Sequence, residues 1–353
     1  MSSSSGAHPR RLEADLRFRL IGLAERFAGR RVAVIGDVIG DEFVYGDPAR
    51  ISREAPVLIL EHDRTTVLPG GAGNAASNVG ALGGAARLVG LVGPRDGELM
   101  DGLRVRVDTS RVLRPEDYRA PVKTRILAGG LHTARQQIVR VDRGQEGDPT
   151  AVAADFERAA LDAAGDCDAL LVSDYGFGLA TPALFARLRE QVADGGYRSP
   201  IPMLVDSRRN LTDFRGCTAC TPNESEAEQA VGAPIGDDPA RLERAGRTLL
   251  QRTEAGGVVI TRGSRGMAVF VPGLPTEHIP IFGSDEVADV TGAGDTVVAT
   301  LTLALAAGAS LYEAARLANY AGGLVVMKRG TAIVTRAELI EAIRMDPDPG
   351  KGD

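Results

Sequence analysis

Short apolar runs alternate with helical patterns over most of the chain, and this alternation limits the possible folds more than any other feature. Runs such as 31–36 and 169–173 are nearly all apolar, as strands are when both faces of a parallel sheet are covered. Between them, apolar residues return every three or four positions, the period of a helix packed by one face. The pattern predicts a three-layer, doubly wound α/β domain with a mostly parallel sheet.

The order of elements can be predicted in some detail. A first helix is expected over 12–27. From residue 151 onward, strands are expected at 169–173, 202–206, 217–221, 257–261, 266–271 and 276–281, and helices at 151–164, 182–192, 224–230 and 239–253, followed by two Ala-rich helices. Polar residues follow several of these strands. Ligands of open α/β sheets bind outside the carboxyl ends of the strands, so this edge is the predicted active site.

Length and composition set the remaining limits. A chain of 353 residues with 44% apolar residues can bury one large core, predicted here over 11–345 between flexible tails at 1–10 and 346–353. A formal charge of −6 without a Lys/Arg block argues against nucleic acid or a membrane as partner. Three cysteines and no signal sequence indicate a cytoplasmic protein with free thiols. Cys217 and Cys220 form a lone C-x-x-C, which is read as part of a strand rather than as a zinc or redox site.

Two segments lack a helical period. Residues near 42–67 and 119–142 carry alternating β-branched and aromatic side chains, which predicts strands that leave the main sheet. Paired together, they would form a small β lid that closes over a substrate and keeps water out. A sheet of this kind exposes edges and an apolar face, so the lid is also the expected contact between two copies of the chain in a homodimer.

The chemistry is predicted to centre on Gly292, Ala293, Gly294 and Asp295. The glycines allow a sharp turn that aims successive amides at one point, and an apolar helix begins directly afterwards. Amides and helix N-terminus together favour an anion such as a phosphoryl group. Asp295, in the first helical turn, is then placed to act as a general base. The alternative is that Asp295 only caps the helix.

A second glycine-rich turn, at 69–84, also runs into a helix. It contains G-x-G-x-x-A at 71–76, which raises a dinucleotide site as an alternative. The residues before it do not form the apolar strand that such a site requires. Asp37 and Asp41 follow the strand at 31–36 and are candidates for binding hydroxyl groups, although Asp37 could serve only to cap a turn.

Asn223 and Glu226 have the spacing of two oxygen ligands for a hydrated Mg²⁺. The same spacing is that of a helix capping box, and the local sequence does not separate the two interpretations.

The sequence D-V-T-G-A-G-D-T at 289–296 resembles the C-terminal signature of the ribokinase-like PfkB sugar kinases, and residues 69–78 resemble their N-terminal signature. The resemblance implies a ribokinase-like fold, ATP as phosphoryl donor and Mg²⁺ as cofactor. It implies that Asp295 is the base and that the amides of 292–294 stabilise the phosphoryl group. It further implies sugar contacts from Gly70, Gly71 and Asn74, magnesium–nucleotide contacts from Asn223 and Glu226, nucleotide contacts from Thr261, Gly263 and Asn319, and a K⁺ site at Asp289 and Thr291.

Further motifs, at 36–41, 50–57, 123–125, 136–142 and 173–176, resemble the branch of this family that phosphorylates C1 of D-glycero-D-manno-heptose 7-phosphate, the kinase half of ADP-heptose synthases. The resemblance implies substrate contacts from Asp37, Asp41, Arg53, Lys123, Arg125, Gln137, Arg140 and Asp174, with the cations on the substrate phosphate.

Two departures from this branch are visible: Phe177 stands where Lys is usual, and Ser207-Arg208-Arg209 stands where Pro-Lys-Gly is usual. No nucleotidyltransferase-like half is seen, so a separate nucleotidyltransferase is the expected pathway partner. Two alternatives stay open, a related kinase for ribose or fructose 1-phosphate and a non-catalytic sugar-binding regulator.

Overall fold

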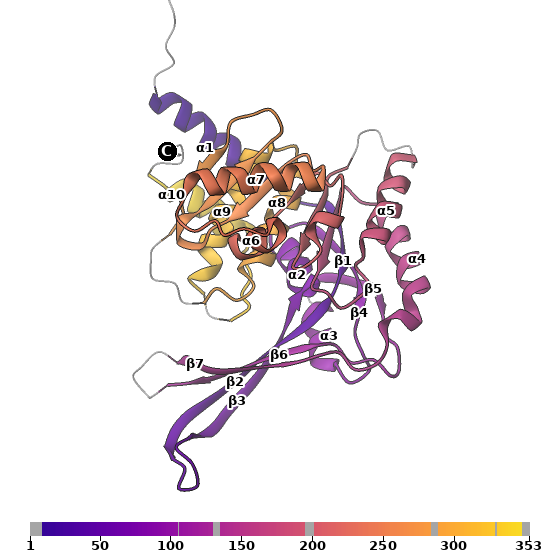
Figure 1. Ribbon diagram of the computed structural model, residues 1–353, viewed down its shortest axis with the longest axis vertical. Coiled ribbons are helices and arrows are strands. Elements are labelled where there is room, and N and C mark those ends of the chain that lie inside the picture. Colours follow the sequence, from indigo (N-terminus) through magenta and orange to yellow (C-terminus); the bar gives the residue numbers. More distant parts are fainter. Residues whose placement is uncertain are drawn as a thin grey trace, which may run out of the picture.

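The computed structural model describes residues 9–104, 106–129, 135–194, 201–283, 289–328 and 330–347. Most of the predicted tails, at 1–8 and 348–353, lie outside these residues, but the first helix begins at Pro9, inside the predicted tail. The described part of the chain forms an α/β body from which a narrow sheet projects (Figure 1). No helix in the described ranges is long and apolar enough to cross a bilayer.

The central sheet has nine strands in the order β13-β12-β11-β10-β9-β8-β1-β4-β5. Pairing is parallel except at β11–β12 and β12–β13. The strands are β1 (Arg31–Gly36), β4 (Ala85–Leu91), β5 (Val107–Leu113), β8 (Ala169–Asp174), β9 (Met203–Ser207), β10 (Ala219–Cys220), β11 (Val258–Thr261), β12 (Met267–Phe270) and β13 (Glu277–Ile279). The predicted strands at 217–221 and 276–281 are shorter than expected. The mostly parallel sheet is as predicted.

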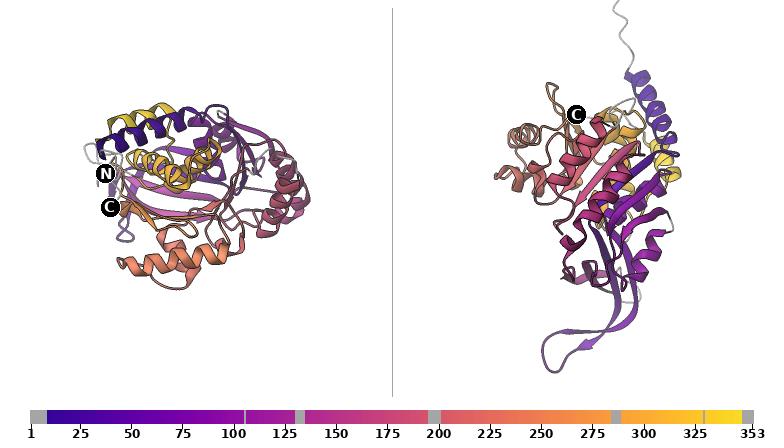
Figure 2. Two further views of the ribbon diagram at one scale, coloured as in Figure 1. Left: turned by 90° about the horizontal axis from the view of Figure 1, so that it is seen from above. Right: turned by 90° about the vertical axis from the view of Figure 1, so that its right-hand side faces the viewer.

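Helices cover both faces of the sheet, which gives the three predicted layers (Figure 2). One layer holds α1 (Pro9–Glu25), α2 (Ala72–Ala81), α8 (Ala293–Ala306), α9 (Leu311–Val326) and α10 (Arg336–Met345). The other holds α4 (Ala153–Ala164), α5 (Pro182–Asp194), α6 (Glu224–Val231) and α7 (Pro239–Thr253). Helix α3 (Gly97–Arg104) packs near β5 and near the strand Leu58–Gly71. Short 3-10 turns lie at Pro149–Val152, Leu211–Asp213 and Gly263–Arg265. Helix α8 is buried along most of its length because nearly all its residues are apolar or small.

The projecting sheet has four strands in the order β3-β2-β6-β7. They are β2 (Val38–Ile51), β3 (Leu58–Gly71), β6 (Val122–Ala128) and β7 (Gln136–Arg143). Strand β2 continues the chain directly after β1, and β3 leads into α2, so the base of this lid is joined to two elements that carry predicted site residues. Both predicted β segments therefore belong to one sheet, whose hairpin tip extends away from the body (Figure 1).

Candidate active site

The predicted anion cradle is the turn that begins α8. Gly292 is the N-cap residue with φ of +76°, and a Cβ built there would lie 2.5 Å from Nδ2 of Asn74. Glycine alone meets both conditions, because the left-handed region disfavours residues with a Cβ. A Cβ built on Gly294 would meet no atom within 4 Å. The two glycines thus differ: the first is required by the turn, and the second borders open space.

The Asp295 carboxyl group is 3% exposed and accepts two side-chain hydrogen bonds. Nδ2 of Asn74 donates to Oδ2 at 2.8 Å, and the hydroxyl of Tyr175 donates to Oδ1 at 2.8 Å. Burial raises the pKa of Asp295 to about 6, and these two hydrogen bonds limit the rise. A carboxyl group with this pKa is ionised at neutral pH and can accept a proton.

Asn74 is oriented by its own helix and by α8. Nδ2 of Asn78 donates to Oδ1 of Asn74 at 3.0 Å, which leaves the Asn74 amide as the donor toward Asp295. Nδ2 of Asn74 also donates to the carbonyl oxygen of Gly292 at 3.3 Å. The two glycine-rich motifs, more than 200 residues apart, therefore meet through one buried amide group.

Asp41 is the second acid close to this point, and it is 5% exposed. The Arg125 guanidinium donates to Oδ1 at 2.6 Å, and the Thr331 hydroxyl donates to Oδ2 at 3.1 Å. A Cβ on Gly70 would lie 2.4 Å from Oδ2 of Asp41, so this glycine allows the carboxylate to approach the backbone. Asp41 is one of the charges that raise the pKa of Asp295, so the two acids lie in the same site.

The carboxylates of Asp37 and Asp174 accept hydrogen bonds from other parts of the chain. The Asp37 carboxylate accepts the backbone N–H groups of Tyr175 and Phe177 at 2.7 and 3.2 Å, and burial raises its pKa to about 6. Asp174 accepts the Gly176 N–H at 2.9 Å and the Ser207 hydroxyl at 2.7 Å. Both carboxylates accept backbone N–H groups of the loop after β8.

Three predicted phosphate-binding cations, Lys123, Arg125 and Arg140, lie on β6 and β7 at the base of the lid. Nζ of Lys123 is 4.6 Å from the centre of the Tyr175 ring, and Arg125 contacts Asp41. Burial, followed by the charge of Arg208, lowers the pKa of Lys123 to about 8. Arg140 pairs with Arg125 across β6 and β7 and binds Asp142 through two bonds of 2.7 Å.

The other two predicted lid contacts lie further out. Gln137 is exposed on β7. Arg53 lies in the turn beyond Ile51, the last residue of β2. Phe43 is the strand partner of Arg125, and Arg53 lies about ten residues further along the chain. At the rise of a strand, this places Arg53 roughly 30 Å from Phe43. Within one chain, Arg53 therefore does not join the other cations.

A cavity of about 350 Å³ opens beside Gly294 and contains most of the predicted nucleotide contacts. Its lining includes Asn223, Thr261, Gly263 and Asn319, together with Ala293 and apolar residues of α8 and α9. The Asn319 amide donates to the Pro280 carbonyl oxygen at 2.9 Å, which fixes one wall. A cavity lined by apolar residues and a few polar groups suits a flat, partly polar ligand.

Asn223 and Glu226 form the capping box of α6, with reciprocal side-chain to backbone bonds of 2.9 Å. Asp206, at the end of β9, lies near Glu226. Its pKa is raised to about 8 by burial first and then by the charges of Glu226 and Asp295. Among the described residues, no three His, Cys, Asp or Glu side chains converge as a ready-made metal site.

The predicted monovalent-cation residues join two loops. Oδ1 of Asp289 accepts the Thr291 N–H at 2.9 Å, and Oδ2 accepts the Gly330 N–H at 3.1 Å. The Asp289 carboxylate therefore links the loop before α8 to the loop that carries Thr331.

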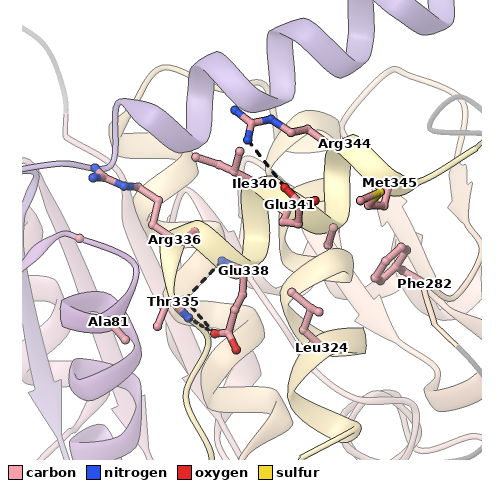
Figure 3. Close-up of a pocket in the computed structure, with 13 residues that line it drawn as sticks. Ala81, Phe282, Leu324, Thr335, Arg336, Glu338, Ile340, Glu341, Arg344 and Met345 are labelled. Atoms are coloured by element: carbon pink, nitrogen blue, oxygen red, sulfur yellow. Dashed lines mark hydrogen bonds and ion pairs between the residues drawn. The ribbon is translucent and has the colours of Figure 1, made fainter.

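A larger cavity, of about 1030 Å³, lies along α10, with Phe282 and Leu324 on its other side (Figure 3). None of the predicted site residues lines it. Its charged groups pair locally, for example Glu338 in the capping box with Thr335. The predicted acids and glycines lie instead around Asp295.

Two residues of the site were not predicted. Tyr175 touches the Asp295 carboxylate, and the Arg208 guanidinium lies 4.1 Å from the centre of the Tyr175 ring. A partial signal existed, since Tyr175 follows a predicted strand and Arg208 lies within one of the two departures from the family pattern. The departure at 207–209 changes a contact in this region. The hydroxyl of Ser207 donates a hydrogen bond to Asp174, which the proline usual at this position could not do.

The fold and the juxtaposed glycines, acids and cations define a class of α/β phosphotransferases that act on an alcohol group. Residues 30–337 match the model of the pfkB family of carbohydrate kinases, and the chain belongs to this family. It is 41% identical over 328 residues to the bifunctional protein HldE of Caulobacter vibrioides, a match that covers 91% of this chain and 65% of that protein. The chain thus spans about two thirds of the length of this relative.

Solved structures support the fold. Arabidopsis thaliana ribokinase, solved with ribose and ATP, superposes with a TM-score of 0.68 at 18% identity and covers 90% of this chain and 100% of its own. Phosphofructokinase-2 of Escherichia coli, solved with potassium, gives a TM-score of 0.67 at 19% identity, covering 90% of this chain and 98% of its own. At these identities the likeness concerns the ribokinase-like fold alone.

Proposed function

We propose that the protein is an ATP-dependent kinase that phosphorylates the C1 hydroxyl of D-glycero-D-manno-heptose 7-phosphate. The 41% identity to the kinase-containing part of HldE supports the substrate class. The observation that carries the proposal is the buried Asp295 carboxylate, placed between the sugar-side residues Asn74 and Asp41 and the glycine turn of α8. The alternative is a kinase of the same family that acts on ribose or fructose 1-phosphate.

In the proposed reaction, Asp295 accepts the proton of the C1 hydroxyl as the hydroxyl oxygen attacks the γ-phosphorus of ATP. The bond between that phosphorus and the β,γ-bridging oxygen breaks, and ADP is the leaving group. The amides at 292–294 and the N-terminus of α8 stabilise the charge on the transferring phosphoryl group. Asp41, with Asn74 and the backbone at Gly70 and Gly71, binds the sugar hydroxyls. Most of the rate enhancement is expected from positioning and from these fixed dipoles.

The nucleotide is assigned to the cavity lined by Thr261, Gly263 and Asn319. Mg²⁺ fits the acids at the phosphate end of this cavity, since Glu226 and Asp295 repel the charge on Asp206 and a cation would relieve that repulsion. We assign it to Asn223 and Glu226 through water, with the nucleotide phosphates as further ligands. The oxygens of Asp289 and Thr291 are proposed for K⁺.

The substrate phosphate is assigned to Lys123, Arg125 and Arg140 at the base of the lid, with Gln137 as a contact further along β7. Arg53 belongs to this set only if a second copy of the chain or a lid movement carries the hairpin tip to a site. The proposed homodimer through the lid offers the first route. A cytoplasmic location and a separate nucleotidyltransferase that uses the product complete the proposal.

The substrate is tested by parallel assays of ATP-dependent phosphorylation on heptose 7-phosphate, ribose and fructose 1-phosphate, with the position of the new phosphate read by NMR. A strong preference for heptose 7-phosphate and a product phosphorylated at C1 are expected. Comparable turnover on ribose or fructose 1-phosphate would favour the alternative, and the absence of turnover on every sugar would favour a sugar-binding regulator.

The role of Asp295 is tested by Asp295→Asn. Because the amide cannot take the hydroxyl proton, kcat should fall by about 10²- to 10⁴-fold, the usual contribution of a general base. Sugar binding, measured by calorimetry, should stay within a few-fold of the wild type. A variant that retains near-normal kcat would exclude Asp295 as the base.

A further inference from the structure

Tyr175 has no role in the reaction described above, yet its hydroxyl makes one of the two side-chain contacts to the base. The O–H group donates to Oδ1 of Asp295 at 2.8 Å, while Asn74 occupies Oδ2. Burial and the neighbouring Asp295 raise the pKa of Tyr175 well above its ordinary value, so the phenol stays protonated and remains a donor. Each carboxylate oxygen thus has its own donor, which defines the plane of the carboxyl group.

The aromatic ring of Tyr175 is itself held in place. Nζ of Lys123 lies 4.6 Å from the ring centre and the guanidinium of Arg208 lies 4.1 Å from it, both within cation–π range. The backbone on either side is anchored as well, because Asp37 accepts the N–H groups of Tyr175 and Phe177. A residue tied at its backbone, ring and hydroxyl presents one fixed donor to the base.

We propose that Tyr175 is a positioning residue for phosphoryl transfer: its hydroxyl orients the Asp295 carboxylate and keeps it charged, and Lys123 and Arg208 hold its ring for that purpose. The inference rests on the proposed role of Asp295 as base. It extends that role by linking the base, through one aromatic ring, to Lys123 of the lid and to Arg208 at the end of β9. It also gives Arg208, at a departure from the family pattern, a part in the site.

The sign of the expected pH effect follows from the groups that face Asp295. Asn74 and Tyr175 donate hydrogen bonds, Arg208 and Lys123 add positive charge, and Asp41 and Asp206 add negative charge. Removing the Tyr175 hydroxyl takes away a bond that stabilises the ionised carboxylate, so the pKa of Asp295 rises. The acid limb of the activity profile must then move to higher pH.

The test compares wild type, Tyr175→Phe and the control Tyr312→Phe, which removes a phenol hydroxyl from the first turn of α9. For each protein, kcat/KM for the sugar phosphate is measured from pH 5 to 9. In Tyr175→Phe, the apparent pKa on the acid side of this profile should rise by about one pH unit. Below that pKa, kcat/KM should be about tenfold lower than in the wild type. At pH 8 the loss should be small. KM should stay near the wild-type value, because the ring that holds Lys123 remains.

An unmoved acid limb in Tyr175→Phe would overturn the proposal, and so would a change confined to KM, which would make the ring only a platform for Lys123. Carboxyl ¹³C NMR of Asp-labelled protein provides a readout that needs no turnover. The Asp295 signal is assigned by its loss in Asp295→Asn. It should titrate at higher pH in Tyr175→Phe than in the wild type, and at the wild-type pH in Tyr312→Phe. If Asp295→Asn keeps its turnover, the base assignment fails, and the NMR titration still decides whether Tyr175 controls this carboxylate.

Discussion

Single side chains in this site have ionisation properties that differ from those of exposed groups, because the site is both buried and crowded with charge. The pKa of Asp295 is raised to about 6 and that of Lys123 is lowered to about 8. An ionised Asp295 and a protonated Lys123 coexist between these two values. The residues thus set a pH window near neutrality, which is where a kinase with this base and this phosphate-binding cation should be most active.

The basic side of this window gives a prediction for Lys123. Above pH 8 the protonated fraction falls about tenfold per unit, so kcat/KM for a phosphorylated sugar should decline with the same slope. In Lys123→Arg the guanidinium keeps its charge, and the decline near pH 8 should disappear. A matching decline in this variant would show that another group titrates there.

Asp206 gives a prediction about stability. Its pKa is about 8 in the fold and near 4 in an unfolded chain, so ionisation destabilises the fold increasingly as pH rises from about 4 to 8. Asp206→Asn removes this penalty and should raise the free energy of unfolding by about 1 to 3 kcal/mol at pH 8, with a smaller gain at pH 5. Urea unfolding at the two pH values measures the difference. An equal gain at both would contradict the assigned pKa.

At the scale of elements, the turn into α8 carries most of the chemistry. The helix is apolar and buried, so its position is set by the core, while the turn before it is set by the backbone freedom of Gly292. Strands β2 and β6, side by side at the base of the lid, bring Asp41 and Arg125 to within 2.6 Å. Most of each of these elements, α8, β2 and β6, therefore packs in the core or the lid, and part of each carries residues of the site.

The two glycines of the turn are predicted to respond differently to alanine. Gly292→Ala should lower stability by about 1 to 3 kcal/mol, because φ is +76° and the new Cβ would clash with Asn74. Gly294→Ala should fold with unchanged or slightly higher stability, because no atom lies near the new Cβ and alanine favours a helix.

Phosphoryl transfer should nevertheless fall at least tenfold in Gly294→Ala, because the methyl group enters the cavity assigned to the nucleotide. Thermal unfolding and initial rates on the two purified variants separate the effects. Equal stability losses in both variants would contradict the different surroundings of the two glycines.

At the scale of the whole molecule, the lid exposes large apolar side chains, among them Val139 and Val141. Strand β7 is exposed along its length, and Val139 and Val141 alternate with Arg140, which pairs with Arg125. The two valines therefore lie on the face opposite Arg125 and Asp41. An apolar sheet face of this kind, with an unpaired edge, is the expected site of contact with a second copy.

The dimer prediction is tested by the double variant Val139→Lys and Val141→Lys. Wild type should sediment as a dimer and the variant as a monomer with an unchanged circular dichroism spectrum, since exposed residues contribute little to the fold. The control is Leu274→Lys, an exposed apolar residue outside the lid. Wild type that sediments as a monomer, or a double variant that remains dimeric, would rule out this face as the interface.

Local sequence was enough to predict the layers of the fold and the two segments that form the lid. The glycine-rich and acidic motifs singled out in it include Asn74 and Asp41, which the structure places near Asp295. Strands buried on both faces and helices buried on one face leave periodic apolar patterns, and Gly292 has a backbone conformation that its neighbours in sequence make recognisable. The inner strand β10 and the edge strand β13 were both predicted too long. Beside β10, Cys217 is apolar and buried but lies outside the strand, so an apolar pattern does not mark where the pairing ends.

What the chain determined by itself is its set of local structures, together with the turn that aims amides and an acid at one point. The tertiary structure alone decided which distant side chains surround that acid. It placed Tyr175 on Asp295, stacked Lys123 and Arg208 on the same ring, and left Arg53 at the hairpin tip. The physical reason is range: hydrogen bonds and cation–π contacts depend on distances of a few ångströms between residues far apart in sequence, and only the packed sheet sets those distances.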